Sequence, residues 1–354
     1  QAHGCSILAC MESAGSVVRH EKGEAIQPLP EGAVLLHIGP HKTGTTALQN
    51  SALKYRDELR RQGVSYLTAG ERGNANYAAR AIRGKPSQKL ESQDSVPMAN
   101  WTDLARLARV AITQRVFISG EGFADCNQAE VEKIVSGLER ERVHVVLTLR
   151  PIAKILTSQW QQYIQNNMKR ASLDEFLNAT LDPAKHDPEV GFWRRHRHDR
   201  LAQRWCNAVG SERVTIVVVD DRSPELIMHS FEDLLKLERG TLRSSKNLVN
   251  RSLTMAEVEA VRGYYRVMDE LGYKSRVYRR GRSVRPALFL KEQRTPAPEE
   301  ARIELPSWSI ERIQELSREI VHGLSIGGYR VIGDLDKLVE VPLGSRSTHV
   351  NVPS

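Results

Sequence analysis

Residues 34–46, with the sequence VLLHIGPHKTGTT, join an apolar run to a glycine-containing turn and a pair of threonines. The apolar run predicts a buried strand, and Thr45 and Thr46 predict a helix that begins directly after the turn. Backbone N–H groups converge at such a junction, and the helix dipole adds about half a positive charge. Because Lys42 adds a full positive charge, the segment predicts a binding site for an anion.

The position of the lysine indicates which anion. Gly39 and Gly44 have the separation of the nucleotide-triphosphate loop G-x-x-x-x-G-K-[ST], but Thr45 stands where that loop has its lysine. Lys42 lies earlier, on the crest of the turn, where it should reach the leaving-group side of the anion. A γ-phosphoryl group carries two charges and usually needs Mg²⁺, whereas a sulfuryl group carries one and can be moved without metal. The loop is therefore expected to favour a phosphosulfate over ATP.

With this loop, the chain resembles the sulfotransferases that use 3′-phosphoadenosine 5′-phosphosulfate, in particular bacterial members with a K-[TS]-G-T-T loop. Those enzymes hold the 3′-phosphate with an arginine at a strand end and a serine eight residues later. Here the candidate strand HVVLTLR ends at Arg150, and Ser158 follows at the matching offset. A strand-end guanidinium offers a planar fork to a phosphate. The predicted donor-binding residues are His41, Lys42, Thr43, Gly44, Thr45, Thr46, Arg150 and Ser158.

A glutamate between two glycines is the candidate general base. The short run RVFIS at 115–119 predicts a strand, and Glu121 follows it with Gly120 and Gly122 on either side, which should leave room above the sheet. Relatives that act on glycosaminoglycans have a glutamate base after the corresponding strand. The bacterial pattern is Ser-His-Glu, and this chain lacks its histidine. The alternative is a solvated turn carboxylate or a charge at a helix N-terminus. Glu121 and Lys42 are the predicted catalytic residues.

Other polar residues have competing interpretations. His37 lies within the first strand and is expected to be packed, whereas His41 could contact phosphate or acceptor. His196 and His198 lack the neighbouring ligands of a metal site, and no metal is predicted. The cluster at 194–199 is expected to be a solvated basic face, with binding of an acidic acceptor as the alternative.

A basic run at 274–285 carries six positive charges among twelve residues. Such runs are usually exposed. The resemblance implies a second possibility, that Arg279, Arg280 or Arg282 closes over the 3′-phosphate.

Composition restricts the partners. The 354 residues carry 51 basic and 43 acidic side chains, a net charge of +8, which favours anionic ligands. Only 6% of the residues are aromatic, so a stacking platform for nucleic acid is not expected. The four cysteines have no metal-ligand spacing, which predicts free thiols and a cytoplasmic protein. The sequence contains no run of eighteen apolar residues, so a membrane anchor is not expected. The expected partner is a small-molecule or carbohydrate acceptor, and the oligomeric state cannot be predicted.

Strand and helix patterns that alternate along the chain predict the fold. Strands are expected at 33–38, 64–67, 115–119, 142–149 and 213–219, the last being the final buried strand. Helices are expected at 45–62, 75–83, 101–113, 128–140, 151–168, 224–237, 254–271 and 307–323, and a capping box at Ser172 and Glu175 should open another. Pro286, Pro296 and Pro298 are expected to mark a loop or flap.

The order of these elements predicts an α/β chain, a three-layer P-loop-like fold with a central parallel sheet flanked by helices, plus a mainly helical C-terminal part. We expect tails at 1–30 and 346–354, and Met11 is a candidate first residue. A single sulfotransferase-like domain is expected over 31–345, with its core sheet in 33–220 and its helical part in 224–340. The polar segments 69–100 and 169–200 are expected to shape the acceptor pocket.

The expected activity is in-line transfer of a sulfuryl group to a hydroxyl, or to an amine, without metal. Two alternatives remain. A metal-dependent small-molecule kinase would need a lysine at position 45 and an acidic strand end. A non-catalytic nucleotide- or glycan-binding scaffold would not depend on Glu121.

Overall fold

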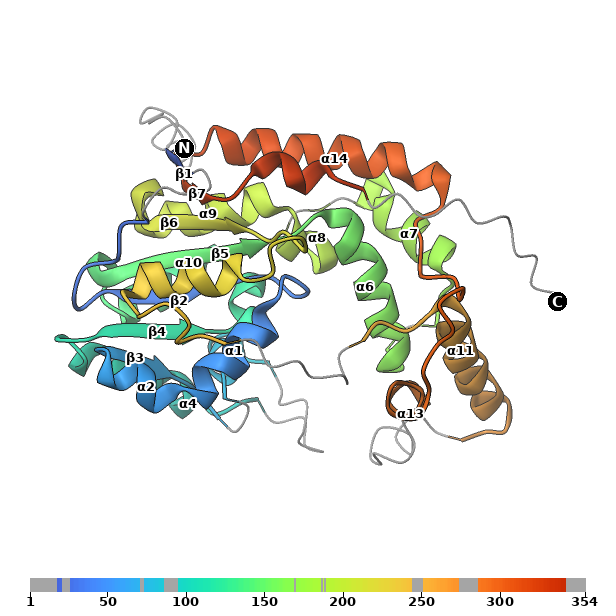
Figure 1. Cartoon of the computed structure of the whole chain (residues 1–354), viewed down its shortest axis with the longest axis horizontal. Helices are drawn as coiled ribbons and strands as arrows, with labels where there is room; N and C mark the ends of the chain where they lie inside the picture. Colours follow the sequence, from blue (N-terminus) through green and yellow to red (C-terminus); the bar gives the residue numbers. More distant parts are fainter. Residues whose placement is uncertain are drawn as a thin grey trace, which may run out of the picture. The chain divides into compact units, whose positions relative to one another are not determined.

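The computed structural model describes residues 18–20, 26–70, 73–85, 95–168, 170–185, 187, 189–243, 251–273 and 286–341. The chain forms two compact units, each built from separate stretches of sequence (Figure 1). Unit 1 comprises residues 1–150, 187–245 and 317–339, and unit 2 comprises 151–186, 246–316 and 340–354. The single domain expected over 31–345 stays a prediction.

Unit 1 contains a seven-stranded sheet in which every neighbouring pair is parallel, with the order β1-β7-β6-β5-β2-β4-β3. Its strands are β1 (Val18–His20), β2 (Val34–His37), β3 (Val64–Leu67), β4 (Arg115–Ser119), β5 (Val143–Leu149), β6 (Val214–Val218) and β7 (Arg330–Ile332). Every residue of β2, β4, β5 and β6 is buried. Their apolar, β-branched sequences fit strands covered on both faces.

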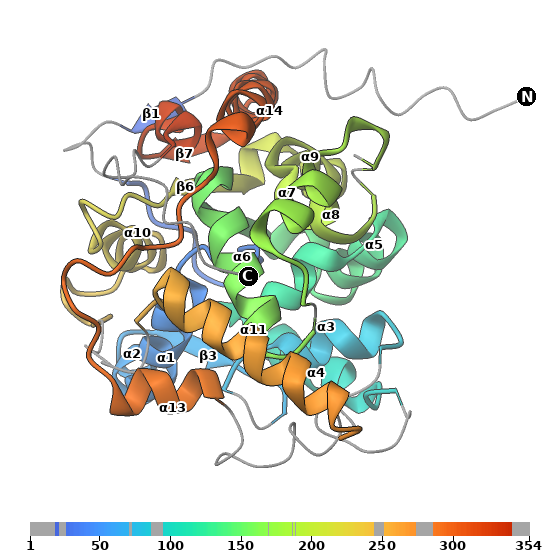
Figure 2. The same ribbon diagram turned by 90° about the vertical axis from the view of Figure 1, so that its right-hand side faces the viewer.

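Helices cover both faces of this sheet. Figure 2 shows α1 (Thr45–Lys54), α2 (Arg56–Arg61) and α10 (Leu226–Leu235) on one side, and α5 (Gln128–Gly137) and α9 (His198–Val209) on the other. Unit 1 also contains α3 (Asn76–Ile82), α4 (Ala99–Val110), α8 (Gly191–His196) and the 3₁₀ helices η1 (Glu121–Asp125), η2 (Arg140–Arg142), η4 (Ser211–Arg213) and η7 (Leu335–Val339). The predicted three-layer α/β fold with a central parallel sheet is confirmed.

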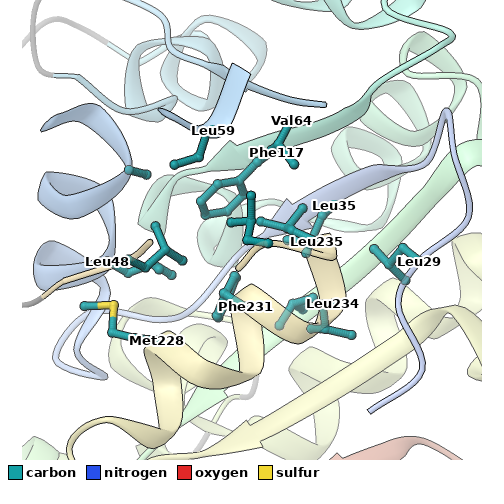
Figure 3. Packing of buried hydrophobic residues seen from close by; sticks show 14 of the residues in the cluster. Leu29, Leu35, Leu48, Leu59, Val64, Phe117, Met228, Phe231, Leu234 and Leu235 are labelled. Carbon is teal, nitrogen blue, oxygen red and sulfur yellow. The ribbon is translucent and has the colours of Figure 1, made fainter. Parts of the chain in front are cut away.

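A hydrophobic cluster joins α1, α2 and α10 to the sheet (Figure 3). Phe231 of α10 packs against Phe117 of β4, with ring centroids 5.5 Å apart, and its edge contacts the ring of His37. Leu48 of α1 and Leu59 of α2 are fully buried in the same cluster. This packing fixes α1, and with it the loop before α1, against the strand ends.

The predicted elements differ from the structure in several places. The helix expected at 45–62 is interrupted at Tyr55 (φ −104°, ψ 24°), whose ring packs against the hydrophobic cluster. The strand at 213–219 is not the last buried one, because β7 follows it and pairs with β6. β1, which pairs with β7, lies inside the tail expected over 1–30. Both missed strands have three residues, too few to show a pattern.

Unit 2 consists of α6 (Ile152–Gln165), α7 (Leu173–Leu181), η3 (Pro183–Lys185), α11 (Met255–Glu270), α13 (Pro286–Gln293) and the first part of α14 (Ser307–Ser325). The capping box predicted at Ser172 and Glu175 is present at the start of α7. Pro286 opens α13 and does not mark a loop, because proline suits the first helical position. Pro296 and Pro298 lie outside regular structure.

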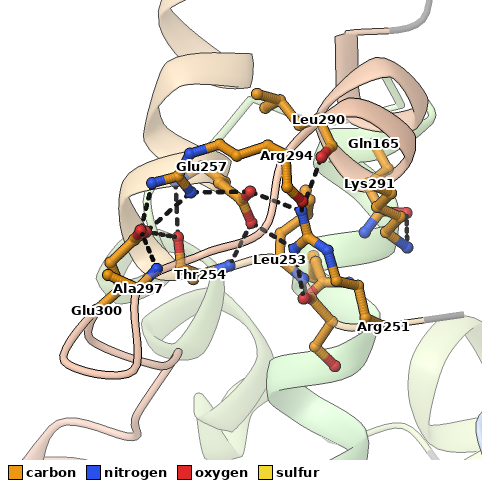
Figure 4. A network of polar contacts seen from close by, with 12 residues as sticks. Gln165, Arg251, Leu253, Thr254, Glu257, Leu290, Lys291, Arg294, Ala297 and Glu300 are labelled. Atoms are coloured by element: carbon orange, nitrogen blue, oxygen red, sulfur yellow. Dashed lines mark hydrogen bonds and ion pairs between the residues drawn. The ribbon is translucent and has the colours of Figure 1, made fainter. Parts of the chain in front are cut away.

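A polar network ties the start of α11 to the residues after α13 (Figure 4). Arg251 donates to both carboxylate oxygens of Glu257 at 2.8 Å, and Arg294 donates to Glu257 at 3.0 Å and also to Glu300. The Thr254 backbone N–H donates to Glu257 as part of a capping box. Burial raises the pKa of Glu257, but these hydrogen bonds and the two guanidinium charges outweigh it and bring the pKa to about 2.

Glu257→Gln should lower the free energy of unfolding by about 3 kcal/mol at pH 7, because it removes the buried carboxylate that Arg251 and Arg294 both contact. The pKa of Glu257 lies below its ordinary value of 4.5, so its contribution is present above pH 4.5 and is lost as the pH falls toward 2. Denaturant titrations of both proteins should therefore converge below pH 4.5. Glu259→Gln, on the same helix and more exposed, should change stability by less than about 0.5 kcal/mol. A gap between wild type and Glu257→Gln that stays constant down to pH 2 would contradict this.

Candidate active site

The carboxyl ends of β2, β4 and β5 lie side by side in the sheet and bring the predicted catalytic segments together. β2 pairs with both neighbours, with His37 opposite Ser119 on β4 and Val146 on β5. The loop 38–44 follows β2, and Glu121 opens η1 just after β4. Parallel sheets bind ligands at this edge, so the register explains why segments far apart in sequence meet here.

The loop has the conformation expected of an anion cradle. Lys42 (φ 75°) and Gly44 (φ 84°) both adopt left-handed backbone, which turns the chain sharply into α1. The Thr43 hydroxyl donates to the Pro40 carbonyl at 2.7 Å and lies 2.9 Å from the Thr148 hydroxyl. Gly44 is the N-cap of α1, and no described side chain caps it. The helix N-terminus therefore presents its dipole to the loop.

His37 holds the base of this loop. Its Nδ1 lies 2.8 Å from the Ser119 hydroxyl and its Nε2 lies 3.1 Å from the Thr148 hydroxyl, so it joins β4 to β5. Burial lowers the pKa of His37 to about 3, although the charge of Glu121 acts in the opposite direction. The ring is thus neutral and structural, and the prediction that His37 is packed is confirmed. Sequence reasoning did not identify Thr148 as a partner of both His37 and Thr43.

Gly39 is required by the close approach of this network. A Cβ at position 39 would lie closer than 3.0 Å to Thr148, His37 and Thr45. Gly39→Ala should therefore lower the free energy of unfolding by about 2 kcal/mol and weaken anion binding, as measured by denaturant titration and calorimetry. Gly263→Ala is the control, because a Cβ at that position in α11 would have nothing within 4 Å, and it should be neutral or stabilising by up to about 1 kcal/mol. Equal effects of the two substitutions would contradict the steric argument.

Glu121 lies directly against the loop. One carboxylate oxygen accepts a hydrogen bond from the Thr45 hydroxyl, and the other lies 2.7 Å from His41 Nδ1. Burial raises the pKa of Glu121, but the hydrogen bonds from His41 and from the Thr45 hydroxyl, together with the charge of Lys42, outweigh it, so the pKa is about 2. The carboxylate is therefore an anion at neutral pH, placed beside the predicted anion site.

The glycines around Glu121 do not leave the open space that the sequence suggested. A Cβ at Gly120 would contact Phe123 and the backbone of Ala75, and one at Gly122 would contact Ala79 and Asn76. Instead, the N-terminal end of α3 packs closely here, and the Gly122 N–H donates to the Asn76 side chain at 2.8 Å. The glycines thus permit the approach of α3, which helps to fix η1 and Glu121.

The two residues predicted for the 3′-phosphate belong to different units. Arg150 is the last residue of unit 1 and directly follows β5, as predicted. Its Nη2 donates to both carboxylate oxygens of Asp221, at 3.0 and 2.7 Å, a partner that the sequence did not indicate. Ser158 is half-buried on α6 of unit 2. Thr46 is exposed in the first turn of α1.

The cluster at 194–199 is not a solvated basic face, and that prediction is wrong. His196 and His198 are completely buried, because they lie on the inward faces of α8 and α9. Burial, with nearby positive charge from Arg195 and other residues, lowers the pKa of His196 well below its ordinary value. Asp125, at the end of η1, forms ion pairs with two arginines. Its carboxylate lies 3.0 Å from the Arg83 guanidinium and 3.4 Å from the Arg195 guanidinium. The arginines thus anchor the 3₁₀ helix that carries Glu121.

Other predictions are only partly covered by the structure. The basic run at 274–285, with Arg279, Arg280 and Arg282, lies outside the described residues. Cys126 and Cys206 are buried and form no disulfide, and Cys5 and Cys10 lie outside the described residues. Within the described ranges, no cluster of histidine, cysteine and carboxylate side chains suits a metal ion, and no helix could cross a membrane.

Neither a protein-family model nor a curated protein matches the chain. Among solved structures, a sulfotransferase from Alicyclobacillus acidocaldarius is similar, with 12% sequence identity, coverage of 72% of this chain and 100% of that chain, and a TM-score of 0.42. Likeness at this level does not assign a family or an activity to this chain. The residues of the site must therefore carry any assignment of function.

Proposed function

We propose that this chain is a sulfotransferase that moves the sulfuryl group of 3′-phosphoadenosine 5′-phosphosulfate to a hydroxyl or amine of a small-molecule or carbohydrate acceptor. The observation that carries the proposal is the contact between Glu121 and the start of α1, where the Thr45 hydroxyl donates to the carboxylate. An ionised carboxylate is thus positioned beside Lys42 and a helix N-terminus that no side chain in the described ranges caps. Such an arrangement suits transfer of an anionic group to a nucleophile that must lose a proton.

In this proposal the loop binds the phosphosulfate. Lys42 and the N–H groups of residues 43–46 neutralise the charge that develops on the bridging oxygen as adenosine bisphosphate leaves. Arg150 and Ser158 hold the 3′-phosphate and distinguish this donor from ATP. The segments 69–100 and 169–200 shape the acceptor site. No nucleic acid or membrane takes part, and the reaction needs no metal.

The negative charge of Glu121 favours removal of the acceptor's proton. With its pKa of about 2, the carboxylate is ionised but weakly basic when Thr45 and His41 both donate to it. A bound donor brings negative charge next to the carboxylate, which raises the pKa and makes proton removal easier. The basicity of the site therefore increases when the donor is in place.

A labelled-donor assay tests this function. The protein is incubated with ³⁵S-labelled donor and a pool of cell metabolites in excess EDTA, and labelled products are separated and identified. We expect label in an organic product and no dependence on Mg²⁺. A parallel reaction contains γ-labelled ATP with Mg²⁺. Transfer from ATP but not from the sulfur donor would favour the metal-dependent kinase, and no transfer in either reaction would favour the non-catalytic scaffold.

A further inference from the structure

His41 and Glu121 form a hydrogen-bonded pair whose partners come from different segments. His41 lies on the loop after β2, and its Nδ1 is 2.7 Å from one oxygen of Glu121 at the start of η1. The other oxygen of Glu121 accepts the Thr45 hydroxyl. Both carboxylate oxygens are thus already engaged. The carboxylate side chain is 17% exposed, whereas the imidazole is 31% exposed.

The geometry fixes the tautomer of the neutral imidazole. Because Nδ1 faces a carboxylate, Nδ1 carries the hydrogen in the neutral ring, and the lone pair is on Nε2. Within the part of the chain that the structure describes, Nε2 makes no hydrogen bond. Among the described residues, Glu121 on η1 and His196 on α8 interact with the ring, Lys42 is its neighbour in the loop, and the buried His196 is neutral. The lone pair of Nε2 is therefore the unengaged basic site of the pair.

We propose that His41 is the catalytic residue that takes the acceptor's proton at Nε2, and that Glu121 is a positioning residue that holds Nδ1–H and balances the imidazolium charge. This inference rests on the proposed function and changes the role that the sequence predicts for Glu121. It also assigns a proton acceptor although Gly120, and not a histidine, precedes Glu121.

The step balances without a further reactant. The acceptor O–H proton moves to His41 Nε2, and the freed electron pair of the acceptor oxygen forms the new O–S bond. The bond between sulfur and the 5′-phosphate oxygen breaks, and its electron pair stays on that oxygen, where Lys42 neutralises it. The imidazolium then returns its proton to solvent.

An NMR measurement of the His41 tautomer tests the contact between His41 and Glu121 without any turnover. Long-range ¹H–¹⁵N spectra of the ¹⁵N-labelled protein distinguish the two imidazole tautomers, and the spectrum of His41→Gln identifies the signals of His41. We expect the Nδ1–H tautomer in the wild type and a mixed population in Glu121→Ala. The exposed His322 provides the reference for an unconstrained ring. An Nε2–H tautomer in the wild type would overturn the proposal, because that nitrogen could not accept a proton.

A kinetic test uses the product found with the sulfur-labelled donor. His41→Gln should lower kcat by roughly 100- to 10,000-fold and leave the KM for the donor within about threefold. Added imidazole should restore part of the activity of His41→Ala, whereas it should not restore that of Glu121→Ala. His322→Gln is the matched control and should behave as the wild type.

The outcomes separate the two proposals. If the wild type transfers label and His41→Gln has an unchanged kcat, or loses only donor affinity, His41 is not the proton acceptor and the sulfotransferase assignment stands. If the wild type transfers no label to any acceptor, the proposed function fails and this inference fails with it. A tautomer consistent with the pair then describes a structural contact only.

Discussion

Replacing Lys42 by methionine should lower kcat by about 100- to 1000-fold while the affinity for adenosine 3′,5′-bisphosphate changes only a few-fold. Lys42 lies in the loop just before α1 and has left-handed backbone (φ 75°). In the proposed function its charge acts on the leaving-group side of the anion. Charge on the bridging oxygen grows as the donor bond breaks, so the lysine acts mainly on the transition state. Methionine keeps the length of the side chain and removes only its charge.

Single-turnover rates with labelled donor measure the effect, and calorimetry with the bisphosphate measures affinity. Lys54→Met, in the last turn of α1, is the control for loss of one positive charge from the same helix region, and it should leave both quantities unchanged. A normal single-turnover rate in Lys42→Met would remove the lysine from the mechanism. An affinity loss as large as the rate loss would make it a general binding residue.

The sheet could be predicted from sequence because its central strands are continuous apolar runs. The segment 115–119 coincides with β4, and Val143–Leu149 differs from its prediction by one residue. Fully buried parallel strands leave this pattern because both faces require apolar side chains. β1 and β7 were not predicted because a strand of three residues is too short to show a pattern of its own.

The candidate site could be predicted as a set of segments, but not as a set of contacts. A strand–turn–helix junction and a strand-end glutamate are local patterns, and parallel pairing places them at one edge of the sheet. The contact of His41 with Glu121 and that of Arg150 with Asp221 depend on the register of the strands and on the exact course of two loops. No local signal encodes such long-range pairs.

The error at His196 and His198 has a related cause. Their neighbours Arg194, Arg195 and Arg197 made the segment look solvated, because clusters of charge usually are. In the structure α8 and α9 bury the histidines beside Trp193 and pair the arginines with carboxylates and carbonyl groups. The spacing of Leu201, Ala202 and Trp205 along α9 was the available signal for a buried face that begins at His198.

Replacing Arg150 by alanine should weaken binding of adenosine 3′,5′-bisphosphate by about 2 kcal/mol, roughly 30-fold, and change ATP binding little. The expected loss is that of charge-assisted hydrogen bonds to the 3′-phosphate, a group that ATP does not have. Arg222→Ala is the control, because its more exposed guanidinium pairs with Asp220. Calorimetry with both nucleotides measures the preference. Equal affinities for the two nucleotides, unchanged in Arg150→Ala, would contradict the donor assignment.

Asp221 makes the Arg150 prediction sharper. In the structure the Asp221 carboxylate accepts hydrogen bonds from Nη2 of Arg150, and the Asp221 side chain is 48% exposed. A bound 3′-phosphate would therefore compete with Asp221 for the same guanidinium. An exposed pair of this kind is worth at most about 1 kcal/mol. Asp221→Asn should therefore strengthen bisphosphate binding by up to about fivefold. The Arg150→Ala, Asp221→Asn double variant should lose this gain, since removing a competitor helps only while the guanidinium is present. If the double variant still binds the bisphosphate more tightly than Arg150→Ala does, Asp221 repels the nucleotide directly. The Asp221 carboxylate and the 3′-phosphate then do not compete for Arg150.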